Sequence, residues 1–160
     1  MQVEDIKNVS VIGAGLMGHG IAQLFACGRY NVCLLDLSGH LLSAAIRNIR
    51  SNLTTLAAKG FGSETEIDPT LSRIRTTTSM ENATAGAQFV IEAVSENLPL
   101  KQQVFQELDR LCPERAILAT NTSVISVTEI AARASHRERI LGTHFWNPPF
   151  VMPLVEIVKG

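Results

Sequence analysis

Short apolar runs and longer amphipathic segments alternate along most of the chain. Continuous apolar runs rich in β-branched residues are typical of strands that helices cover on both faces of a sheet. Apolar positions that recur at three- and four-residue steps are typical of helices packed along one side. The predicted strands lie at residues 9–12, 31–36, 74–78, 89–94, 116–120, 140–144 and 151–158. The predicted helices cover residues 21–26, 38–60, 98–111 and 126–134.

This alternation predicts an α/β fold with a doubly wound, mostly parallel sheet and helices on both of its faces. In such a fold, ligands bind at the carboxyl ends of the strands. Residues 60–69 are mostly polar, and we expect them to form a connection without regular structure. Ser126 and Glu129 have the spacing of a capping box, which predicts that the Ser126 side chain caps the short helix that follows.

The segment after the second predicted strand indicates a long helix. Ser38 is a suitable N-cap, and Gly60 is the type of residue that commonly follows the end of a helix. The helix is longer than a crossover between parallel strands requires, so we expect it to project beyond the sheet. Arg47, Arg50 and Lys59 give it a positive surface, which suits either a binding face or an ordinary solvated helix face.

Composition narrows the class of protein. The chain has 160 residues, 46% of them hydrophobic, and a net charge of -1, which favours one folded domain and argues against a nucleic-acid partner. The N-terminus does not resemble a signal peptide, and apolar runs are too short to span a membrane, so we expect a soluble, cytoplasmic protein without a membrane partner. Cys27, Cys33 and Cys112 lack C-x-x-C spacing, which favours reduced thiols over disulfides or a metal site.

A glycine-rich turn follows the first predicted strand. Its sequence fits G-x-G-x-x-G, and it stands between a strand and a helix as dinucleotide-binding turns do. The first glycine permits a tight turn, the second lets the backbone approach a pyrophosphate, and the third lets the helix pack closely on the strand. The pattern therefore predicts a Rossmann-type fold in which a helix N-terminus binds the dinucleotide phosphates. The residues of this turn are Gly13, Ala14, Gly15, Leu16, Met17 and Gly18.

Asp36 ends the second predicted strand, about twenty residues after the glycine turn. A carboxylate at this place can accept hydrogen bonds from the adenine ribose hydroxyls, and its charge repels the 2′-phosphate of NADP. Asp36 therefore predicts NAD as the cofactor. The simpler interpretation is that Asp36 only caps the helix that follows.

The C-terminal part of the chain carries a more specific block. Residues 142–149 read Gly-Thr-His-Phe-Trp-Asn-Pro-Pro, and residues 154–160 read Leu-Val-Glu-Ile-Val-Lys-Gly. Together they closely resemble the signature of the L-3-hydroxyacyl-CoA dehydrogenase family, which segments 13–20, 92–97 and 121–123 also match. This resemblance spans the whole chain. It implies NAD-dependent oxidation of an L-3-hydroxyacyl-CoA to the 3-oxoacyl-CoA, or the reverse, as an enzyme of fatty-acid metabolism such as β-oxidation.

By this resemblance, His144 is similar to the family's catalytic base and Glu156 to the acid that orients and supports it. Ordinary chemistry agrees, because hydride loss from a hydroxyl-bearing carbon requires removal of the hydroxyl proton, and histidine is the usual base near neutral pH. Ser123 is similar to the residue that hydrogen-bonds the substrate oxygen. Without the resemblance, Ser123 would be interpreted as an ordinary turn residue and His144 as a structural histidine.

The resemblance also implies roles in ligand binding. Asn147 matches a position at the nicotinamide end of the cofactor, and Glu96 and Lys101 match further cofactor contacts. Lys59 matches a position on the long helix that meets the coenzyme A phosphates. Two residues depart from the family's pattern: Asn52 stands where close relatives have a serine that contacts coenzyme A, and Trp146 stands where phenylalanine is usual and could narrow the acyl pocket.

The family resembled continues into a helical domain that forms the dimer and closes the acyl cleft. We therefore expect residues 1–160 to be the NAD-binding and catalytic domain of a longer, homodimeric protein, able to bind NAD but slow in turnover by itself. A second domain on a separate polypeptide is the alternative. Two other functions stay open, namely a dehydrogenase of a non-thioester 3-hydroxy acid of the carnitine or gulonate type and a non-enzymatic NAD-binding protein.

Overall fold

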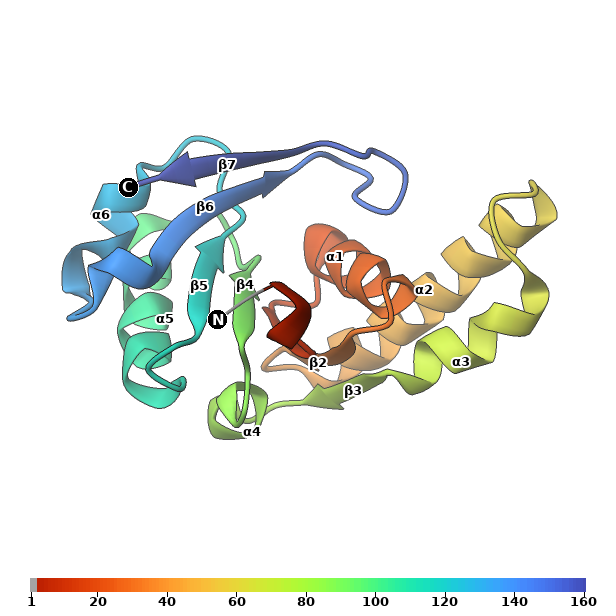
Figure 1. Cartoon of the computed structure of the whole chain (residues 1–160), viewed down its shortest axis with the longest axis horizontal. Coiled ribbons are helices and arrows are strands. Elements are labelled where there is room, and N and C mark those ends of the chain that lie inside the picture. Colours follow the sequence, from red (N-terminus) through yellow and green to blue (C-terminus); the bar gives the residue numbers. More distant parts are fainter. Residues whose placement is uncertain (1–2) are drawn as a thin grey trace.

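The computed structural model describes residues 3–160 and builds them around a seven-stranded sheet in the order β3-β2-β1-β4-β5-β6-β7 (Figure 1). All neighbouring strands are parallel except β6 and β7, which are antiparallel. The order of the strands reverses between β1 and β4, which is where ligands bind in doubly wound folds. The strands are β1 Asn8–Ile12, β2 Asn31–Leu35, β3 Ile74–Thr77, β4 Phe89–Glu92, β5 Ile117–Thr120, β6 Ile140–Phe145 and β7 Val155–Lys159.

Helices cover both faces of this sheet, so successive residues of a strand enter two different cores. Val11 and Leu34 pack in the core beneath α1 and α2, whereas Ile12 and Leu35 pack in the core beneath α4, α5 and α6. This two-sided burial explains the continuous apolar runs and confirms the predicted fold class. The helices are α1 Leu16–Cys27, α2 Gly39–Ala58, α3 Ile67–Ser72, α4 Met80–Thr84, α5 Leu98–Leu111 and α6 Val127–Ile130, with short 3-10 segments at Val3–Asp5, Glu64–Glu66, Ala131–Arg133 and Arg137–Arg139.

Helix α2 projects beyond the sheet, as predicted (Figure 1). The Ser38 side chain accepts a hydrogen bond from the backbone N–H of Leu41, and Gly60 follows the helix with a φ of +81°. The expectation of an unstructured connection at residues 60–69 is wrong, because α3 returns along α2. Ile67 and Thr70 are buried there. Because this burial depends on contact with α2, the sequence of a short polar segment does not reveal it.

Two further expectations need correction, and one further helix was not expected. The last strand begins at Val155 and not at residue 151, because Val151 and Met152 donate backbone hydrogen bonds to Pro148 in a turn. Ser126 makes no side-chain hydrogen bond to the start of α6, so the capping box is absent. Helix α4 lies in a segment without a predicted element, and its Ser79 N-cap accepts a hydrogen bond from Asn82. Among residues 3–160, no helix is both long and apolar enough to span a membrane.

The hairpin of β6 and β7 extends past the end of β5 and reaches toward α1 (Figure 1). Strand β5 pairs with β6 only up to Gly142, whereas β7 pairs with β6 up to Phe145. The tip of the hairpin lies on α1, where a Cβ built on Gly20 would be 2.6 Å from Cγ of Pro149. The outer part of β6 is therefore supported by β7 on one side and by helix α1 at the tip.

Candidate active site

The glycine turn connects β1 to α1, and two of its glycines are required by the backbone around them. Gly13 has a φ of +102°, and a Cβ on it would lie 2.7 Å from the carbonyl oxygen of Ala93. A Cβ on Gly18 would overlap the carbonyl oxygen of Gly13. Both clashes are with backbone atoms that cannot move aside. The turn therefore keeps α1 close against the end of β1, as a dinucleotide-binding turn requires.

Gly15 differs from these two glycines because it faces open space. It is exposed, it is the N-cap residue of α1, and a Cβ on it would meet nothing within 4 Å. No side chain caps α1 and no acidic residue lies in its first turn, so the exposed N-terminus of this helix favours an anion. These residues fit the pyrophosphate of a dinucleotide, which needs close backbone approach and a free helix N-terminus.

A cleft of about 490 Å³ opens beside this turn at the carboxyl ends of β1, β2 and β4. Asp36 borders it, directly after β2, and accepts hydrogen bonds from the backbone N–H groups of Ala14 (2.9 Å) and Ser38 (3.1 Å). Asp36 thus holds both the glycine turn and the residue that caps α2, and its proposed bond to the adenine ribose stays a prediction. The apolar side of the cleft is suited to a planar base and includes Leu37, Leu41, Met80, Val94 and Leu100.

Three polar side chains meet at the same edge of the sheet, on the other side of the strand-order reversal. His144 of β6 lies directly opposite Glu156 of β7, and its Nδ1 is 2.6 Å from a carboxylate oxygen of Glu156. Ser123, in the turn after β5, places its Oγ 3.0 Å from Nε2 of the same imidazole. Because an ionised carboxylate can only accept, Nδ1 of His144 carries the proton and Nε2 of the neutral ring is an acceptor.

The environment of Glu156 keeps its carboxylate ionised. The hydrogen bond from His144 lowers the pKa of Glu156, slight desolvation opposes this, and a hydrogen bond from the indole of Trp146 lowers the pKa further. The indole Nε1 lies 3.3 Å from the same oxygen that binds His144. Sequence reasoning assigned Trp146 to the acyl pocket and missed this bond, although its position two residues after His144 places both side chains on one face of the extended chain.

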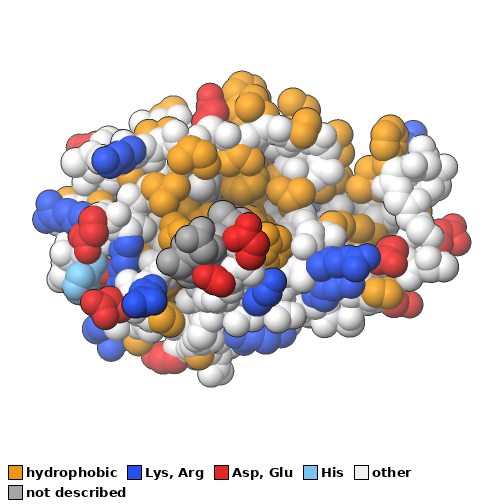
Figure 2. Space-filling view, in the orientation of Figure 1, with side chains coloured by type: hydrophobic (Ala, Val, Ile, Leu, Met, Phe, Trp, Pro, Cys, Tyr) orange, Lys and Arg blue, Asp and Glu red, His pale blue; other side chains and the backbone are white. Residues whose placement is uncertain are grey.

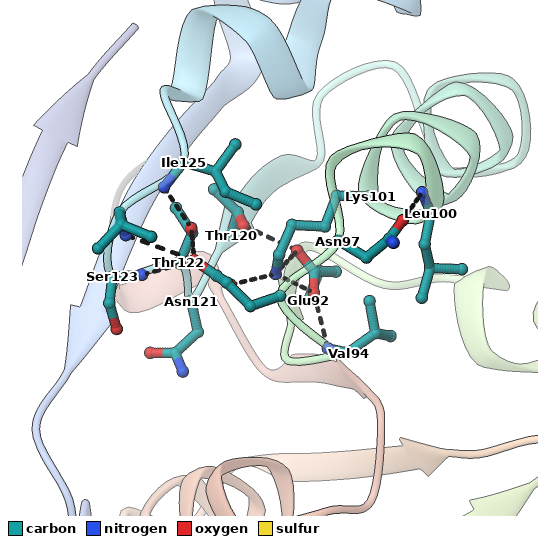
Figure 3. Close-up of polar contacts among 12 residues, drawn as sticks. Glu92, Val94, Asn97, Leu100, Lys101, Thr120, Asn121, Thr122, Ser123 and Ile125 are labelled. Atoms are coloured by element: carbon teal, nitrogen blue, oxygen red, sulfur yellow. Dashed lines mark hydrogen bonds and ion pairs between the residues drawn. The ribbon is translucent and has the colours of Figure 1, made fainter.

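A buried network supports the Ser123 turn (Figure 3). Lys101 of α5 forms an ion pair with Glu92 at the end of β4, and neither side chain has exposed surface. Lys101 also contacts Glu96, which accepts hydrogen bonds from Thr122, Ser123 and Val124. The resemblance implies that Lys101 contacts the cofactor directly, but no atom of its side chain is exposed to make such a contact. Glu92 also belongs to this network, and sequence reasoning did not single it out.

The remaining candidate residues lie apart from these groups. Asn52 of α2 donates a hydrogen bond from its amide to Gln23 of α1 (3.0 Å). Lys59 is exposed at the far end of α2, and Asn147 is exposed in the β6–β7 turn. The structure thus brings Ser123, His144, Glu156 and Glu96 into one connected group, and it leaves Asn52 and Lys59 along α2.

Comparisons with known proteins agree with this geometry. Residues 8–160 match the family described as "3-hydroxyacyl-CoA dehydrogenase, NAD binding domain". The chain is 41% identical over 156 residues to the probable 3-hydroxybutyryl-CoA dehydrogenase of Bacillus subtilis, covering 98% of this chain and 54% of that protein. It is 38% identical over 159 residues to the mitochondrial hydroxyacyl-coenzyme A dehydrogenase of Homo sapiens, covering 96% and 51%.

A solved structure gives the same picture. The crystal structure of (S)-3-hydroxybutyryl-CoA dehydrogenase from Ralstonia eutropha superimposes with a TM-score of 0.93 at 38% identity, covering 98% of this chain and 55% of that one. The chain therefore spans about half the length of these relatives.

Proposed function

Because this chain belongs to the family of 3-hydroxyacyl-CoA dehydrogenase NAD-binding domains, we propose that it binds NAD and carries the catalytic residues for interconversion of an L-3-hydroxyacyl-CoA and the 3-oxoacyl-CoA. The observation that carries this proposal is the pair of hydrogen bonds on His144, to Glu156 at 2.6 Å and to Ser123 at 3.0 Å. They lie at the edge of the sheet that also bears the glycine turn. A base and a dinucleotide turn at one edge suit a dehydrogenase.

The residues that would hold NAD divide by type of contact. The backbone of the glycine turn and the N-terminus of α1 suit the pyrophosphate, and Asp36 suits the adenine ribose. Glu96 and Asn147 are proposed for the nicotinamide end. When bound, NAD⁺ supplies the acceptor for the hydride that leaves the hydroxyl-bearing carbon.

His144 is proposed as the general base. Its Nε2 takes the proton of the substrate hydroxyl, and Glu156 holds the ring in the required tautomer through Nδ1. The carboxylate also stabilises the imidazolium that forms, as the acid of a serine-protease triad does. The Ser123 hydroxyl lies beside Nε2, so it is placed to orient the substrate oxygen toward the base. In the reverse direction the same groups return the proton to the oxygen of the 3-oxo group.

The acyl-CoA is proposed to lie between α2 and the β6–β7 hairpin. Lys59 suits the coenzyme A phosphates, and Asn52 is proposed as a further contact along α2. Asn52 donates its amide to Gln23, which leaves its carbonyl oxygen as an acceptor where a serine would offer a hydroxyl donor. The exposed indole of Trp146 borders the dyad and suits the acyl side of the site.

We further propose that residues 1–160 act together with a helical segment that completes the acyl cleft and forms a homodimer. Hydrophobic side chains gather on the surface along the upper edge of the molecule (Figure 2). On the hairpin, Val151, Leu154 and Ile157 are 54%, 46% and 68% exposed, which is much apolar surface for one short segment. Such a surface suits a covering helix.

Acetoacetyl-CoA reduction, followed as oxidation of NADH, tests this function. We expect turnover of the thioester and little turnover of free acetoacetate, with His144→Gln as the inactive control. Activity should rise sharply when the helical segment of a close relative is joined to the chain. A protein that binds NADH yet reduces neither compound with or without that segment would contradict the proposed reaction. Equal turnover of both compounds would instead favour a non-thioester hydroxy acid.

A further inference from the structure

A pair of opposite charges is buried beneath the turn that carries Ser123. Nζ of Lys101 lies 2.8 Å and 3.0 Å from the two carboxylate oxygens of Glu92, and both side chains have an exposed fraction of 0%. Removing two charges from water is costly, and well-packed apolar residues at such positions are often equally stable or more so. Stability alone is therefore a weak explanation for these two residues.

Glu92 uses its remaining acceptor capacity to join neighbouring strand ends. One oxygen accepts a hydrogen bond from the backbone N–H of Val94 (2.7 Å), just after β4. The other accepts a hydrogen bond from the hydroxyl of Thr120 (2.7 Å), the last residue of β5. With Lys101 of α5, the carboxylate thus fixes three elements relative to one another. The turn that leaves β5 begins at the next residue.

Lys101 extends this network to the turn itself through Glu96. Its Nζ lies 3.4 Å from one oxygen of Glu96. The other oxygen of Glu96 accepts hydrogen bonds from the Thr122 hydroxyl and from the backbone N–H groups of Ser123 (3.2 Å) and Val124 (3.4 Å). A single carboxylate oxygen therefore holds the backbone of the turn, and Lys101 is the cation beside that carboxylate.

We propose that Lys101 and Glu92 are positioning residues that keep Glu96 ionised and so hold Ser123 against His144. Glu92 fixes the ammonium group of Lys101, Lys101 supports the negative charge of Glu96, and Glu96 fixes the turn. The consequence for the reaction rests on the proposed function, whereas the effect on the turn does not. Because Lys101 is fully buried, its influence on a bound ligand passes through Glu96 and Ser123 and not through direct contact.

The competing explanation is that the pair only stabilises the fold, and a second pair in the chain provides a matched control. Asp109 and Arg139 form an ion pair at 2.8 Å with side chains only 7% and 10% exposed. Asp109 accepts a hydrogen bond from the backbone N–H of Ser135, and Arg139 donates to the carbonyl of Pro113. This pair joins the end of α5 to the segment before β6 without contacting the Ser123 turn, so we expect its removal to affect stability alone.

The test compares Glu92→Gln/Lys101→Met with Asp109→Asn/Arg139→Met by NMR of the ¹⁵N-labelled protein. Partial burial raises the pKa of Glu96, but the Thr122 hydrogen bond, the Lys101 charge and the two backbone N–H groups outweigh it and hold the pKa below its ordinary value. The amide signals of Ser123 and Val124 should therefore follow protonation of Glu96. We expect the midpoint pH of this change in the two amide signals to rise by about one pH unit in Glu92→Gln/Lys101→Met and to stay unchanged in the control.

Turnover of acetoacetyl-CoA supplies the second measurement. We expect kcat to fall about tenfold in Glu92→Gln/Lys101→Met and to stay close to that of the unchanged protein in the control, at a temperature where both variants are folded. An unchanged Glu96 midpoint, or equal losses in both variants, would overturn the proposal. A shifted midpoint in a protein without dehydrogenase activity would support the positioning of the turn and contradict the proposed function.

Glu96→Gln keeps the test decisive if the double variant does not fold. Glu96 is partly exposed, and glutamine has the same shape, so this variant is expected to fold. The pH-dependent shifts of the Ser123 and Val124 amides should disappear, and kcat should fall about tenfold. Normal turnover in Glu96→Gln would show that Lys101 and Glu92 cannot act on the reaction through this carboxylate.

Discussion

The two sides of the strand-order reversal build their sites by different means. On the side of β1 and β2, the backbone forms the site, because Gly13 and Gly18 shape the turn and Gly15 leaves space for a ligand. On the side of β5, β6 and β7, the side chains of Ser123, His144 and Glu156 form the site through hydrogen bonds to one another. The backbone site therefore depends on residues that lack a side chain, and the side-chain site depends on distances between elements. Substitutions on the two sides should therefore have different effects, on turnover for the side-chain site and on NADH affinity for the backbone site.

The largest effect is expected from the side-chain site. Glu156→Gln should lower turnover by roughly two or more orders of magnitude, the scale of positioned acid–base help, because Nδ1 loses its anionic acceptor. His144→Gln should cost at least as much. Both variants should keep the NADH affinity of the unchanged protein, since neither residue contacts the glycine turn. Steady-state kinetics of acetoacetyl-CoA reduction and fluorescence titration with NADH measure the two quantities.

A double variant shows whether His144 and Glu156 act as a unit. His144→Gln/Glu156→Gln should lose little more turnover than the worse single variant, because residues that act together are not additive. Additive losses, or a Glu156→Gln protein with near-normal turnover, would mean that Glu156 is an ordinary strand residue.

The backbone site is tested by three glycine substitutions that the structure separates. Gly18→Ala should lower both thermal stability and NADH affinity, the latter about 10- to 100-fold, because its Cβ overlaps backbone. Gly15→Ala should lower NADH affinity alone, because nothing of the chain lies within 4 Å of the new Cβ. Gly39→Ala, which also has open space, is the control and should change neither. If Gly15→Ala bound NADH normally, the pyrophosphate would not lie at this turn.

A smaller effect is expected for the choice between the two nicotinamide cofactors. The protein should bind NADH at least about tenfold more tightly than NADPH, since about 1.4 kcal/mol of repulsion between Asp36 and a 2′-phosphate is enough for this factor. Asp36→Asn should narrow the difference. Titration calorimetry with both cofactors measures it, and a preference of the unchanged protein for NADPH would refute the role of Asp36.

The smallest effect is expected at Trp146, which is exposed and contacts the side-chain site through its hydrogen bond to Glu156. Trp146→Phe removes one hydrogen bond from Glu156 and should lower turnover about two- to fivefold.

The lowered pKa of Glu156 means that its charge is present at neutral pH and is lost as the pH falls through that pKa. Trp146 is the only tryptophan, so protein fluorescence should change over this acidic range. Glu156→Gln should abolish the change; its persistence would show that fluorescence reports another group.

The contrast also explains what could be predicted from the sequence. The glycine turn, Asp36 and the long helix with its Ser38 cap depend on residues close together along the chain, and their elements were predicted from spacing. The fold class is confirmed by the sheet order and the structural match. His144 and Glu156 were assigned by resemblance. The register of β6 and β7 places them opposite each other.

The features that sequence reasoning missed depend on packing between distant segments. Helix α3 is held by burial of Ile67 and Thr70 against α2, which a polar segment of this length does not reveal. The burial of Lys101 requires Glu92 and Glu96 to approach it from a neighbouring strand end and loop. A lysine in an amphipathic helix is usually exposed, so no local signal marked this one. The catalytic and binding roles of the candidate residues stay predictions.

The overhanging hairpin is held against the rest of the protein at three places. β6 pairs with β5 up to Gly142, the backbone N–H of Phe145 donates a hydrogen bond to the side chain of Asn121 (2.9 Å), and the tip rests on α1 through Pro149 and Gly20. Because His144 and Glu156 lie together on the hairpin and Ser123 lies in the turn after β5, the separation of Ser123 from His144 depends on how these contacts seat the hairpin, whereas that of His144 from Glu156 depends on the hairpin alone.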